Sequence, residues 1–424
     1  MDRLTMTPAE QLVAVMTRIY ESRLTTPSGG NLSVLDEDGS LWVTPSQIDK
    51  GRLTAAHMVQ IHADGSWKRD GKPTSEWPFH RAVLQARPDC RAVVHAHPTS
   101  LVAFSVVGKP LALDQFPDLC RWANRVGFAP YAIPGSQKLG QVLGEVFATG
   151  CDATLMENHG AVACGRELME AFHRFEALEH LASILLAGAR LGGLRARSAS
   201  EMRDAVARMD RAWERVDVDG ASQSAQRTAL ADSVRRAHAR GLLGSRTGAF
   251  SSRCGDGLLI APDSADNAEL RAGDLVYVEG DRSETGRPPN AMVGLHQAIY
   301  DAHPGVRSVA TALPAYLMAF AASGVAFDTR TIPEAYIFLK SVLTLPFAAR
   351  FDGELVAEVL HDKAPVALIE SACAVVTGES PFAVFDRLEV AEFTARSILD
   401  SAAIGGLKPM SDGVLQEICR VYGC

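Results

Sequence analysis

Apolar residues follow two different spacings along the chain, and segments with the two spacings alternate. Apolar positions three and four residues apart recur over 9–23, 76–87 and 167–190, which predicts amphipathic helices there. Shorter apolar runs predict strands at 41–43, 92–95, 153–156, 275–278 and 366–369. Strands and helices mixed in this way predict an α/β fold, with a layered sheet that carries helices on both faces.

The second half of the chain repeats the pattern of the first half. Matching residues lie 217, 216, 216 and 213 positions apart in the pairs Pro45/Pro262, His80/His296, Pro98/Pro314 and Gly165/Gly378. Local sequences agree as well, because Phe-His-Arg-Ala-Val at 79–83 corresponds to Leu-His-Gln-Ala-Ile at 295–299. A period of this length indicates duplication of a whole domain and excludes a solenoid of short repeats.

We therefore expect two domains of similar size, residues 1–195 and residues 223–424, joined by a linker at residues 196–222. The length of the chain agrees, because one hydrophobic core rarely serves more than about 250–300 residues. The connecting segment is polar, and its pattern predicts a helix over 199–215 and a loose turn at 218–220. Its arginines are interspersed with acidic and small residues, which is typical of a solvated helix face.

The composition excludes several classes of protein. The net charge is −8 and no block of basic residues is present, so neither nucleic acid nor a membrane surface is an expected partner. No apolar run reaches the ~18 residues that span a bilayer, and the first residues lack the layout of a secretory signal. The eight cysteines are scattered without a Cys-x-x-Cys pair, which predicts reduced thiols. A cytoplasmic protein is therefore expected.

Three histidines of the first half have the spacing of metal ligands. His95 and His97 are separated by one residue on a predicted strand, so both side chains point to one face about 6.5–7 Å apart. His159, followed by Gly160, lies at the end of another predicted strand. Three imidazoles leave coordination positions open, which is the arrangement of a catalytic rather than a structural site.

The alternative for these histidines is a purely structural role in buried hydrogen bonds. The second half weakens that alternative, because the matching stretches 309–314 and 370–373 contain no histidine. His80, in contrast, is matched by His296, which indicates a structural role for His80.

Glu76 is the candidate acid/base group beside these histidines. It follows Ser75, a good N-cap residue, at the start of the helix predicted to run to Arg87. A glutamate there is also favourable for the helix dipole alone. Its counterpart in the second half is Met292, so the helix does not require the acid, and this favours a functional role.

Polar loops at 28–33, 44–46 and 73–75 surround these candidates in the first half. Their backbone N–H groups and hydroxyls suit a phosphate, carboxylate or hydroxyl group, although each loop alone is ordinary turn chemistry. The corresponding stretches 248–251 and 261–263 have lost the asparagine and two hydroxyls and have gained an aspartate.

Five short motifs together resemble the class II aldolase/adducin family. They are Gly30-Asn31-Leu32-Ser33, Thr44-Pro45-Ser46, Thr74-Ser75-Glu76, His95-Ala96-His97-Pro98 and Glu157-Asn158-His159-Gly160. The resemblance covers residues 8–192, whereas residues 228–405 resemble the family only in framework. It implies two tandem αβα sandwiches, each with a central mixed or antiparallel sheet, of which only the first is catalytic.

The resemblance also implies the site. One divalent cation per chain is bound by His95, His97 and His159, with zinc favoured and Fe²⁺, Mn²⁺ or Co²⁺ as alternatives. Glu76 is then the acid/base and occasional ligand. The anionic end of the substrate is held by Gly30, Asn31, Ser46, Thr74 and Ser75.

The activity implied by the resemblance is that of a metal-dependent lyase. An aldolase- or decarboxylase-type enzyme would act on a small hydroxy or keto sugar, or a keto acid, through a metal-bound enediolate. The same three histidines also serve oxidative decarboxylases or oxygenases, dehydratases and epimerases in the family, and adducin-like relatives are non-enzymatic scaffolds. Gln47 stands where the sugar-phosphate enzymes usually have glycine, which leaves phosphorylation of the substrate open.

Family members are commonly cyclic tetramers with sites at subunit interfaces. A fused pair of copies is therefore expected to form a homodimer that imitates a tetramer of domains. Segment 329–336 is expected to face the partner, because its polar groups have no evident partner within their own copy.

Overall fold

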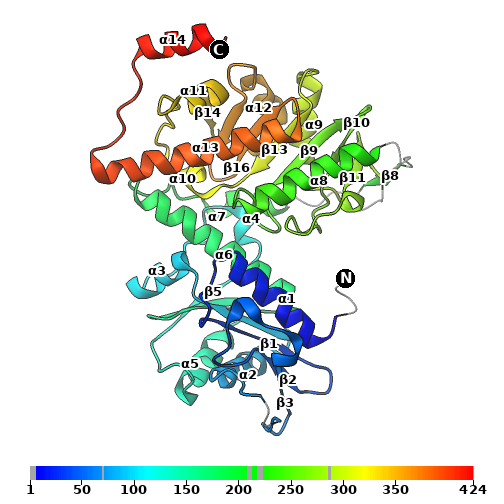
Figure 1. Cartoon of the computed structure of the whole chain (residues 1–424), viewed down its shortest axis with the longest axis vertical. Coiled ribbons are helices and arrows are strands. Elements are labelled where there is room, and N and C mark those ends of the chain that lie inside the picture. Colours follow the sequence, from blue (N-terminus) through cyan, green and yellow to red (C-terminus); the bar gives the residue numbers. More distant parts are fainter. Residues whose placement is uncertain (1–5, 69–70, 208–212, 217–222, 285–287, 424) are drawn as a thin grey trace. The chain divides into compact units, whose positions relative to one another are not determined.

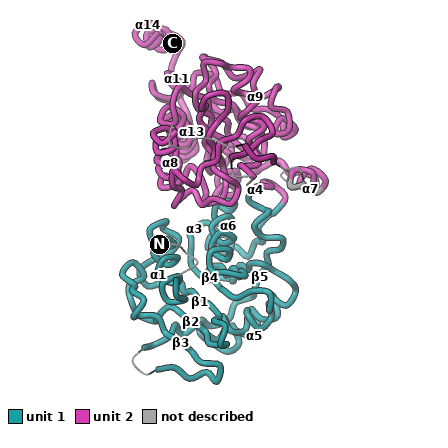
Figure 2. Tube along the Cα trace, turned by 90° about the vertical axis from the view of Figure 1, so that its right-hand side faces the viewer, with its two compact units in different colours: residues 1–113, 119–182 teal, residues 114–118, 183–424 magenta. Residues whose placement is uncertain are grey.

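The structure is a computed structural model that describes residues 6–68, 71–207, 213–216, 223–284 and 288–423. The chain divides into two compact units (Figure 2). Unit 1 comprises residues 1–113 and 119–182, and unit 2 comprises residues 114–118 and 183–424. No helix in the described part of the chain is both long enough and apolar enough to cross a membrane.

Unit 1 is built on a seven-stranded sheet in the order β3-β2-β1-β4-β7-β6-β5. Its strands are β1 (Asn31–Leu35), β2 (Leu41–Val43), β3 (Val59–Ile61), β4 (Ala92–Ala96), β5 (Val126–Ala129), β6 (Ala153–Met156) and β7 (Gly160–Gly165). All neighbouring strands are antiparallel except β5 and β6, which are parallel. The prediction of a mixed, mainly antiparallel sheet is confirmed.

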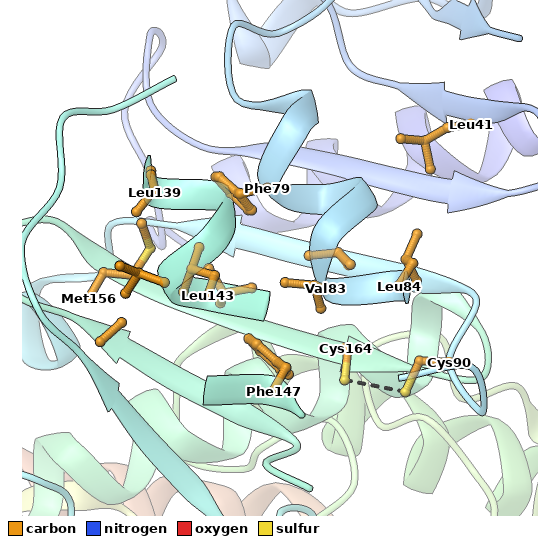
Figure 3. Close-up of a cluster of buried hydrophobic side chains, with 14 of the residues drawn as sticks. Leu41, Phe79, Val83, Leu84, Cys90, Leu139, Leu143, Phe147, Met156 and Cys164 are labelled. Carbon is orange, nitrogen blue, oxygen red and sulfur yellow. Dashed lines mark hydrogen bonds between the residues drawn. The ribbon is translucent and has the colours of Figure 1, made fainter. Parts of the chain in front are cut away.

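Helices cover both faces of this sheet (Figure 1). They are α1 (Pro8–Glu21), α2 (Trp77–Ala86), α3 (Thr99–Val107), α5 (Gln137–Phe147) and α6 (Leu168–Ala189), with short 3₁₀ turns at Lys50–Arg52 and Ala55–His57. The short helix α4 (Pro117–Cys120) begins in residues that belong to unit 2 and ends in residues of unit 1. Helices α2 and α5 pack on one face through buried side chains that include Phe79, Val83, Leu143 and Phe147 (Figure 3). Helix α6 packs with α1, where the Arg18 guanidinium lies over the Phe172 ring, and with α3, whose first N–H groups donate to Glu179 of α6.

Unit 2 repeats this sheet. Its order is β14-β15-β16-β13-β9-β10-β11, extended by β12 and β8. The strands are β8 (Glu214–Arg215), β9 (Ala249–Cys254), β10 (Gly257–Ile260), β11 (Val276–Glu279), β12 (Arg282–Ser283), β13 (Ser308–Ala312), β14 (Val342–Leu345), β15 (Val366–Ile369) and β16 (Cys373–Gly378). The central strand β13 pairs with β9 and β16 as β4 pairs with β1 and β7, and the one parallel pair among the repeated strands, β14 with β15, corresponds to β5 with β6.

The helices of unit 2 follow the same plan. They are α7 (Ala199–Ala207), α8 (Ser224–Ala239), α9 (Val293–Ala302), α10 (Ala315–Ser323), α11 (Pro333–Leu339), α12 (Gly353–Val359), α13 (Pro381–Ser401) and α14 (Asp412–Tyr422), with 3₁₀ turns at Ala272–Asp274, Phe347–Phe351 and Ala402–Ile404. Helix α13 packs with α8 and α10 on the sheet, and α9 packs with α12 (Figure 1). Shared strand order, register and helix order confirm that the chain contains two copies of one domain.

One expectation about the connecting segment needs correction, and another is not tested. The helix predicted over 199–215 ends at Ala207 among the described residues, and Glu214–Arg215 forms a strand instead. The reason is that this dipeptide pairs in parallel with β12 at the edge of the sheet, so tertiary pairing overrides helix propensity. The predicted loose turn at 218–220 lies outside the described residues.

The expectation that the polar groups of segment 329–336 need a partner subunit is wrong for its first two residues. The Thr329 hydroxyl donates to the Lys340 carbonyl oxygen at 2.5 Å, and Arg330 forms an ion pair with Asp328 at 2.8 Å. Both side chains therefore have partners within their own copy.

A half-buried glutamate caps the start of a neighbouring helix in each copy. In unit 1, Glu179 on α6 accepts the backbone N–H groups of Ser100 and Leu101 at 3.0 and 2.9 Å. In unit 2, Glu392 on α13 accepts those of Tyr316 and Leu317 at 3.0 and 2.8 Å. Helices α3 and α10 both start after a proline that offers no side-chain cap, so the glutamate satisfies their free N–H groups.

Burial of Glu392 makes the stability of the fold depend on pH. Burial raises the pKa of Glu392 from 4.5 to about 7, because a buried carboxylate is poorly solvated. Since the folded pKa lies above the unfolded one, this stabilising contribution is complete below pH 4.5 and is lost as the pH rises through 7. Between pH 6 and pH 8 the wild-type protein should lose about 1 kcal/mol more of unfolding free energy than Glu392→Gln. Urea unfolding at both pH values measures this, with the exposed Glu417→Gln as control. Equal pH dependence in wild type and Glu392→Gln would contradict the prediction.

Candidate metal centre

His95 lies in the middle of the first sheet, and its ring has a fixed orientation. Strand β4 places it opposite Asn31 of β1 on one side and Val162 of β7 on the other. The side chain is fully buried, and its Nδ1 lies 2.9 Å from the Ala161 carbonyl oxygen. A carbonyl oxygen only accepts, so Nδ1 carries the proton and Nε2 presents a lone pair.

Two further imidazoles meet His95 at that lone pair. The Nε2 atoms of His95 and His97 are 3.0 Å apart. The His159 ring lies edge-on to His95 and tilted against His97, with ring-centroid separations of 4.9 and 5.1 Å. One nitrogen from each residue lies within 4.8 Å of the others. The structure thus brings the three histidines together, from the end of β4 and from the turn between β6 and β7.

The turn that carries His159 is tight. Asn158, just before His159, has a left-handed backbone with φ of +54°, and Gly160 comes directly after His159. A Cβ atom at Gly160 would lie only 2.6 Å from the Ala96 carbonyl oxygen and 2.7 Å from the His97 ring. Glycine is therefore required there, because the turn must approach β4 closely for His159 to reach the cluster.

All three imidazoles are neutral near pH 7. Burial lowers the pKa of His97 to about 4 and holds the pKa of His95 well below its usual range. Burial also lowers the pKa of His159, although the nearby Glu76 carboxylate opposes the shift. Neutral imidazoles present the lone pairs that a metal ion needs.

Glu76 faces the cluster from the start of α2. Its Oε2 lies 3.4 Å from His95 Nε2 and its Oε1 lies 3.6 Å from His159 Nε2. Asn31 Nδ2 donates to Oε2 at 2.8 Å, whereas Oε1 is buried without a hydrogen-bond partner among the described residues. The prediction that Ser75 caps this helix is wrong: Glu76 itself occupies the N-cap position, and its N–H donates to the Thr74 hydroxyl at 3.3 Å.

These groups fit a divalent cation. Three neutral nitrogen donors converge, and an unpartnered buried carboxylate oxygen faces them. A cation at the nitrogens would satisfy the lone pairs that otherwise face one another, and its charge would stabilise the carboxylate.

Among the described residues of unit 2, no three His, Cys, Asp or Glu side chains lie close enough together to hold a metal ion. Thr311 stands at the position of His95, opposite Ala249 of β9, and its hydroxyl lies 3.1 Å from His296 Nε2. Ala372 follows Ser371, whose φ of +55° matches that of Asn158. The same strand and the same turn are kept, but the ligands are absent.

The three polar loops of unit 1 are tied together. The Thr44 hydroxyl accepts the Leu32 N–H at 3.1 Å, and the Thr74 N–H donates to the Thr44 carbonyl oxygen at 3.1 Å. Pro45 and Pro73 form a bridge between the second and third loops. Of the residues expected to hold the substrate, Thr74 is buried, Ser46 is half-buried and Ser75 is exposed.

Gly30 lies against the backbone of β4 at His95. Its φ is +72°, and a Cβ atom there would lie 2.8 Å from the His95 carbonyl oxygen, so no other residue fits without a shift. Gln47, in contrast, has a left-handed backbone with φ of +60° although it is not glycine. It therefore carries backbone strain in the loop expected to meet the substrate.

Sequence reasoning missed two features of the site. Lys50 is buried, with 3% of its surface exposed, and its Nζ donates to the Pro45 carbonyl oxygen at 2.8 Å. Burial lowers the pKa of Lys50 to about 8. The second feature is the bond between Asn31 and Glu76. No spacing marks either one, because both depend on how separate loops fold against each other.

Two curated proteins illustrate what the chain is similar to. The chain is 33% identical over 180 residues to 3-oxo-tetronate 4-phosphate decarboxylase of Escherichia coli strain K12, covering 42% of this chain and 84% of that protein. It is 32% identical over 178 residues to L-fuculose phosphate aldolase of the same strain, covering 42% of this chain and 82% of that protein. Both relatives are lyases by name.

Among solved structures, the chain is similar to L-fuculose-1-phosphate aldolase from Thermus thermophilus. The identity is 26%, the TM-score is 0.36, and the match covers 43% of this chain and 93% of that chain.

The family comparison covers both copies. The sequence model of the class II aldolase and adducin N-terminal domain matches residues 10–186 and again residues 228–399. The chain therefore belongs to the class II aldolase and adducin N-terminal domain family.

Proposed function

We propose that the protein is a divalent-metal-dependent lyase whose chemistry lies in the first domain, residues 1–195. The second domain, residues 223–424, is then a non-catalytic copy, and residues 196–222 connect the two. The observation that carries the proposal is the convergence of three neutral histidines and Glu76 in one copy, set against its absence from the described residues of the other.

The three histidines would hold the cation. When bound, it supplies a Lewis acid that polarises a carbonyl or hydroxyl oxygen of the substrate. His95 is oriented for this by the Ala161 carbonyl oxygen, and Gly160 keeps the turn with His159 close enough. Zinc is the favoured metal, because neutral imidazole nitrogens in a buried site suit it well.

Glu76 would move the proton. One of its oxygens is anchored by Asn31, and the other has free lone pairs beside His159. In the bond-breaking direction the carbon–carbon bond gives its electron pair to the fragment that keeps the carbonyl group, and the other fragment leaves as an aldehyde or as CO₂. Glu76 would take the hydroxyl proton of a departing aldehyde and would give a proton to the fragment that received the electron pair. A small hydroxy or keto sugar, or a keto acid, supplies the two neighbouring oxygens that this chemistry needs. The two curated relatives, an aldolase and a decarboxylase, support this reaction class.

We assign the anionic end of the substrate to the linked loops that carry Gly30, Ser46, Thr74 and Ser75. The resemblance implies Asn31 there as well, but Glu76 and His80 engage both ends of its amide, so we do not assign its side chain to the substrate. Lys50 supports an anionic substrate, because a buried ammonium group with a single carbonyl partner among the described residues leaves positive charge at the base of these loops. We also infer that two chains form a homodimer of four domains. The second copy keeps the fold of a subunit although it lacks the site, so each chain can take the place of two subunits in a tetramer of domains.

The content of bound metal tests the proposal. We expect about one divalent ion per chain, and His95→Ala should weaken metal affinity at least about 100-fold and abolish lyase activity. His361→Ala, at an exposed histidine of unit 2, is the control and should change neither property. Atomic emission on the purified protein gives the stoichiometry. A value near zero that metal addition does not restore would contradict the enzyme proposal, and a value near two would contradict the non-catalytic second copy.

Lys50→Met tests the charge at the loops. The neutral side chain should raise KM for the anionic substrate about tenfold while kcat changes less than about threefold. The melting temperature should not fall, because burying an ammonium group is costly and methionine is not charged. Steady-state kinetics and calorimetry measure both effects, with the exposed Lys109→Met as the control. An unchanged KM in Lys50→Met would remove Lys50 from the substrate site.

Gln47→Gly tests whether the substrate is phosphorylated. Glycine relieves the left-handed strain, which should stabilise the protein by about 1 kcal/mol, and lets a phosphate approach the backbone. We expect KM for a phosphorylated substrate to fall relative to KM for its unphosphorylated form. Arg23→Gly, at another left-handed position with φ of +59°, controls for stability alone. A gain in stability without any change in this KM ratio would place Gln47 outside the substrate site.

A further inference from the structure

We propose that Asn31 is a positioning residue: its amide holds the Glu76 carboxylate against the histidine cluster, and His80 holds the opposite end of that amide. The inference rests on the proposed function, because it concerns the acid/base group of the same site.

The bond between Asn31 and Glu76 is asymmetric. Asn31 Nδ2 donates to Oε2 at 2.8 Å, and the same Oε2 lies 3.4 Å from His95 Nε2. The other oxygen, Oε1, has no hydrogen-bond partner among the described residues and lies 3.6 Å from His159 Nε2. One oxygen is therefore anchored, and the other stays available for a proton. Glu76 has no other side-chain hydrogen bond in the described part of the protein.

The Glu76 carboxylate only accepts, so it fixes the Asn31 amide with its NH₂ group toward Glu76, and His80 holds the other end of the amide. His80 Nε2 bonds to Asn31 Oδ1, and His80 Nδ1 lies 2.8 Å from the Ser33 hydroxyl. Because an amide oxygen only accepts, Nε2 carries the proton, and Nδ1 of the neutral ring accepts from Ser33. Full burial keeps His80 neutral by lowering its pKa to about 3. A flipped amide would set its oxygen against the carboxylate and its NH₂ group against another donor, so the network permits one orientation.

The second copy separates the scaffold part of this network from the functional part. The Ser251 hydroxyl bonds to His296 Nδ1 at 2.7 Å, as Ser33 bonds to His80. His296 Nε2 turns to the Thr311 hydroxyl at 3.1 Å. The Ser–His pair is thus kept in both copies and serves the fold.

The amide and the acid are kept only in the first copy. Ala249 lies at the strand position of Asn31, opposite Thr311, and Met292 occupies the N-cap position of α9 as Glu76 does in α2. The Asn–Glu pair therefore occurs together with the three histidines. A role limited to packing would not require the asparagine to disappear when the glutamate does.

This role differs from direct contact with the substrate. Both ends of the Asn31 amide are already engaged within the protein, and only 5% of the residue is exposed. Loss of a substrate contact raises KM, whereas loss of the group that orients the base lowers kcat. The split between the two constants distinguishes the roles.

The experiment compares Asn31→Ala and Asn31→Asp with wild type and with Ser251→Ala. The first variant introduces the residue that the second copy has at this strand position. The second variant keeps an acceptor for His80 and a nearly identical shape, but places a carboxylate against Glu76. We expect kcat to fall about 10- to 100-fold in both variants with KM within about twofold of wild type. Ser251→Ala breaks the matching hydrogen bond in the copy without a site and should change neither constant.

A second readout does not depend on activity. Each protein is loaded with Co²⁺ alone, and its visible absorption spectrum is recorded. A carboxylate released from Asn31 changes the surroundings of the metal, so the spectrum should change in both Asn31 variants and stay unchanged in Ser251→Ala. L-Fuculose 1-phosphate and 3-oxo-tetronate 4-phosphate, the compounds in the relatives' names, are the activity probes.

The outcomes separate the two proposals. A raised KM with unchanged kcat would make Asn31 a substrate contact and overturn the inference, as would wild-type spectra in both Asn31 variants. If wild type binds Co²⁺ but turns over neither probe, the lyase proposal loses support, and the spectra alone decide the role of Asn31. Should Asn31→Ala fail to fold, the isosteric Asn31→Asp provides the same comparison.

Discussion

The pairing of strand β4 with β1 and β7 is the constraint on which the candidate site depends. It places His95 in the centre of the sheet, opposite Asn31 and beside the Ala161 carbonyl oxygen that orients its ring. The other groups are arranged relative to that ring: His97 follows on the same segment, and the β6–β7 turn delivers His159. A slip of one residue in this register would turn His95 to the opposite face and dismantle the cluster.

The two copies allow fold and function to be separated within one chain. Both keep the strand order and the left-handed residue in the turn before β7 or β16. Both also keep a hydrogen bond between a serine of β1 or β9 and the histidine of α2 or α9, and a glutamate that caps the start of α3 or α10. These shared features stabilise the framework. The histidine cluster, Glu76 and Asn31 occur together in the first copy, and the described residues of the second have none of them. This contrast supports a structural role for the groups that both copies keep, and it is the basis on which we propose a functional role for the groups of the first copy alone.

Much of this could be predicted from the sequence, because duplication and periodicity are local or repeated signals. The three histidines could be found since two share a strand and the third precedes a glycine, and the second copy weakened the structural alternative. The Asn31–Glu76 bond and the buried Lys50 could not be found, because they depend on side chains from separate loops meeting in space. The sequence wrongly predicts Ser75 as the cap of α2, since a cap depends on the backbone angles at one residue, and Glu76 takes that position. The strand at 214–215 depends on a distant edge strand, which no local pattern reveals.

One copy of the domain is expected to carry the metal and the other to carry none. A crystal structure of the full chain grown with Co²⁺ or Zn²⁺, with anomalous diffraction recorded at the metal edge, tests this most directly. We predict one anomalous peak per chain, within bonding distance of His95, His97 and His159, and none beside Thr311 and Ala372. A peak of similar height in the second copy, or no peak at the three histidines, would contradict it.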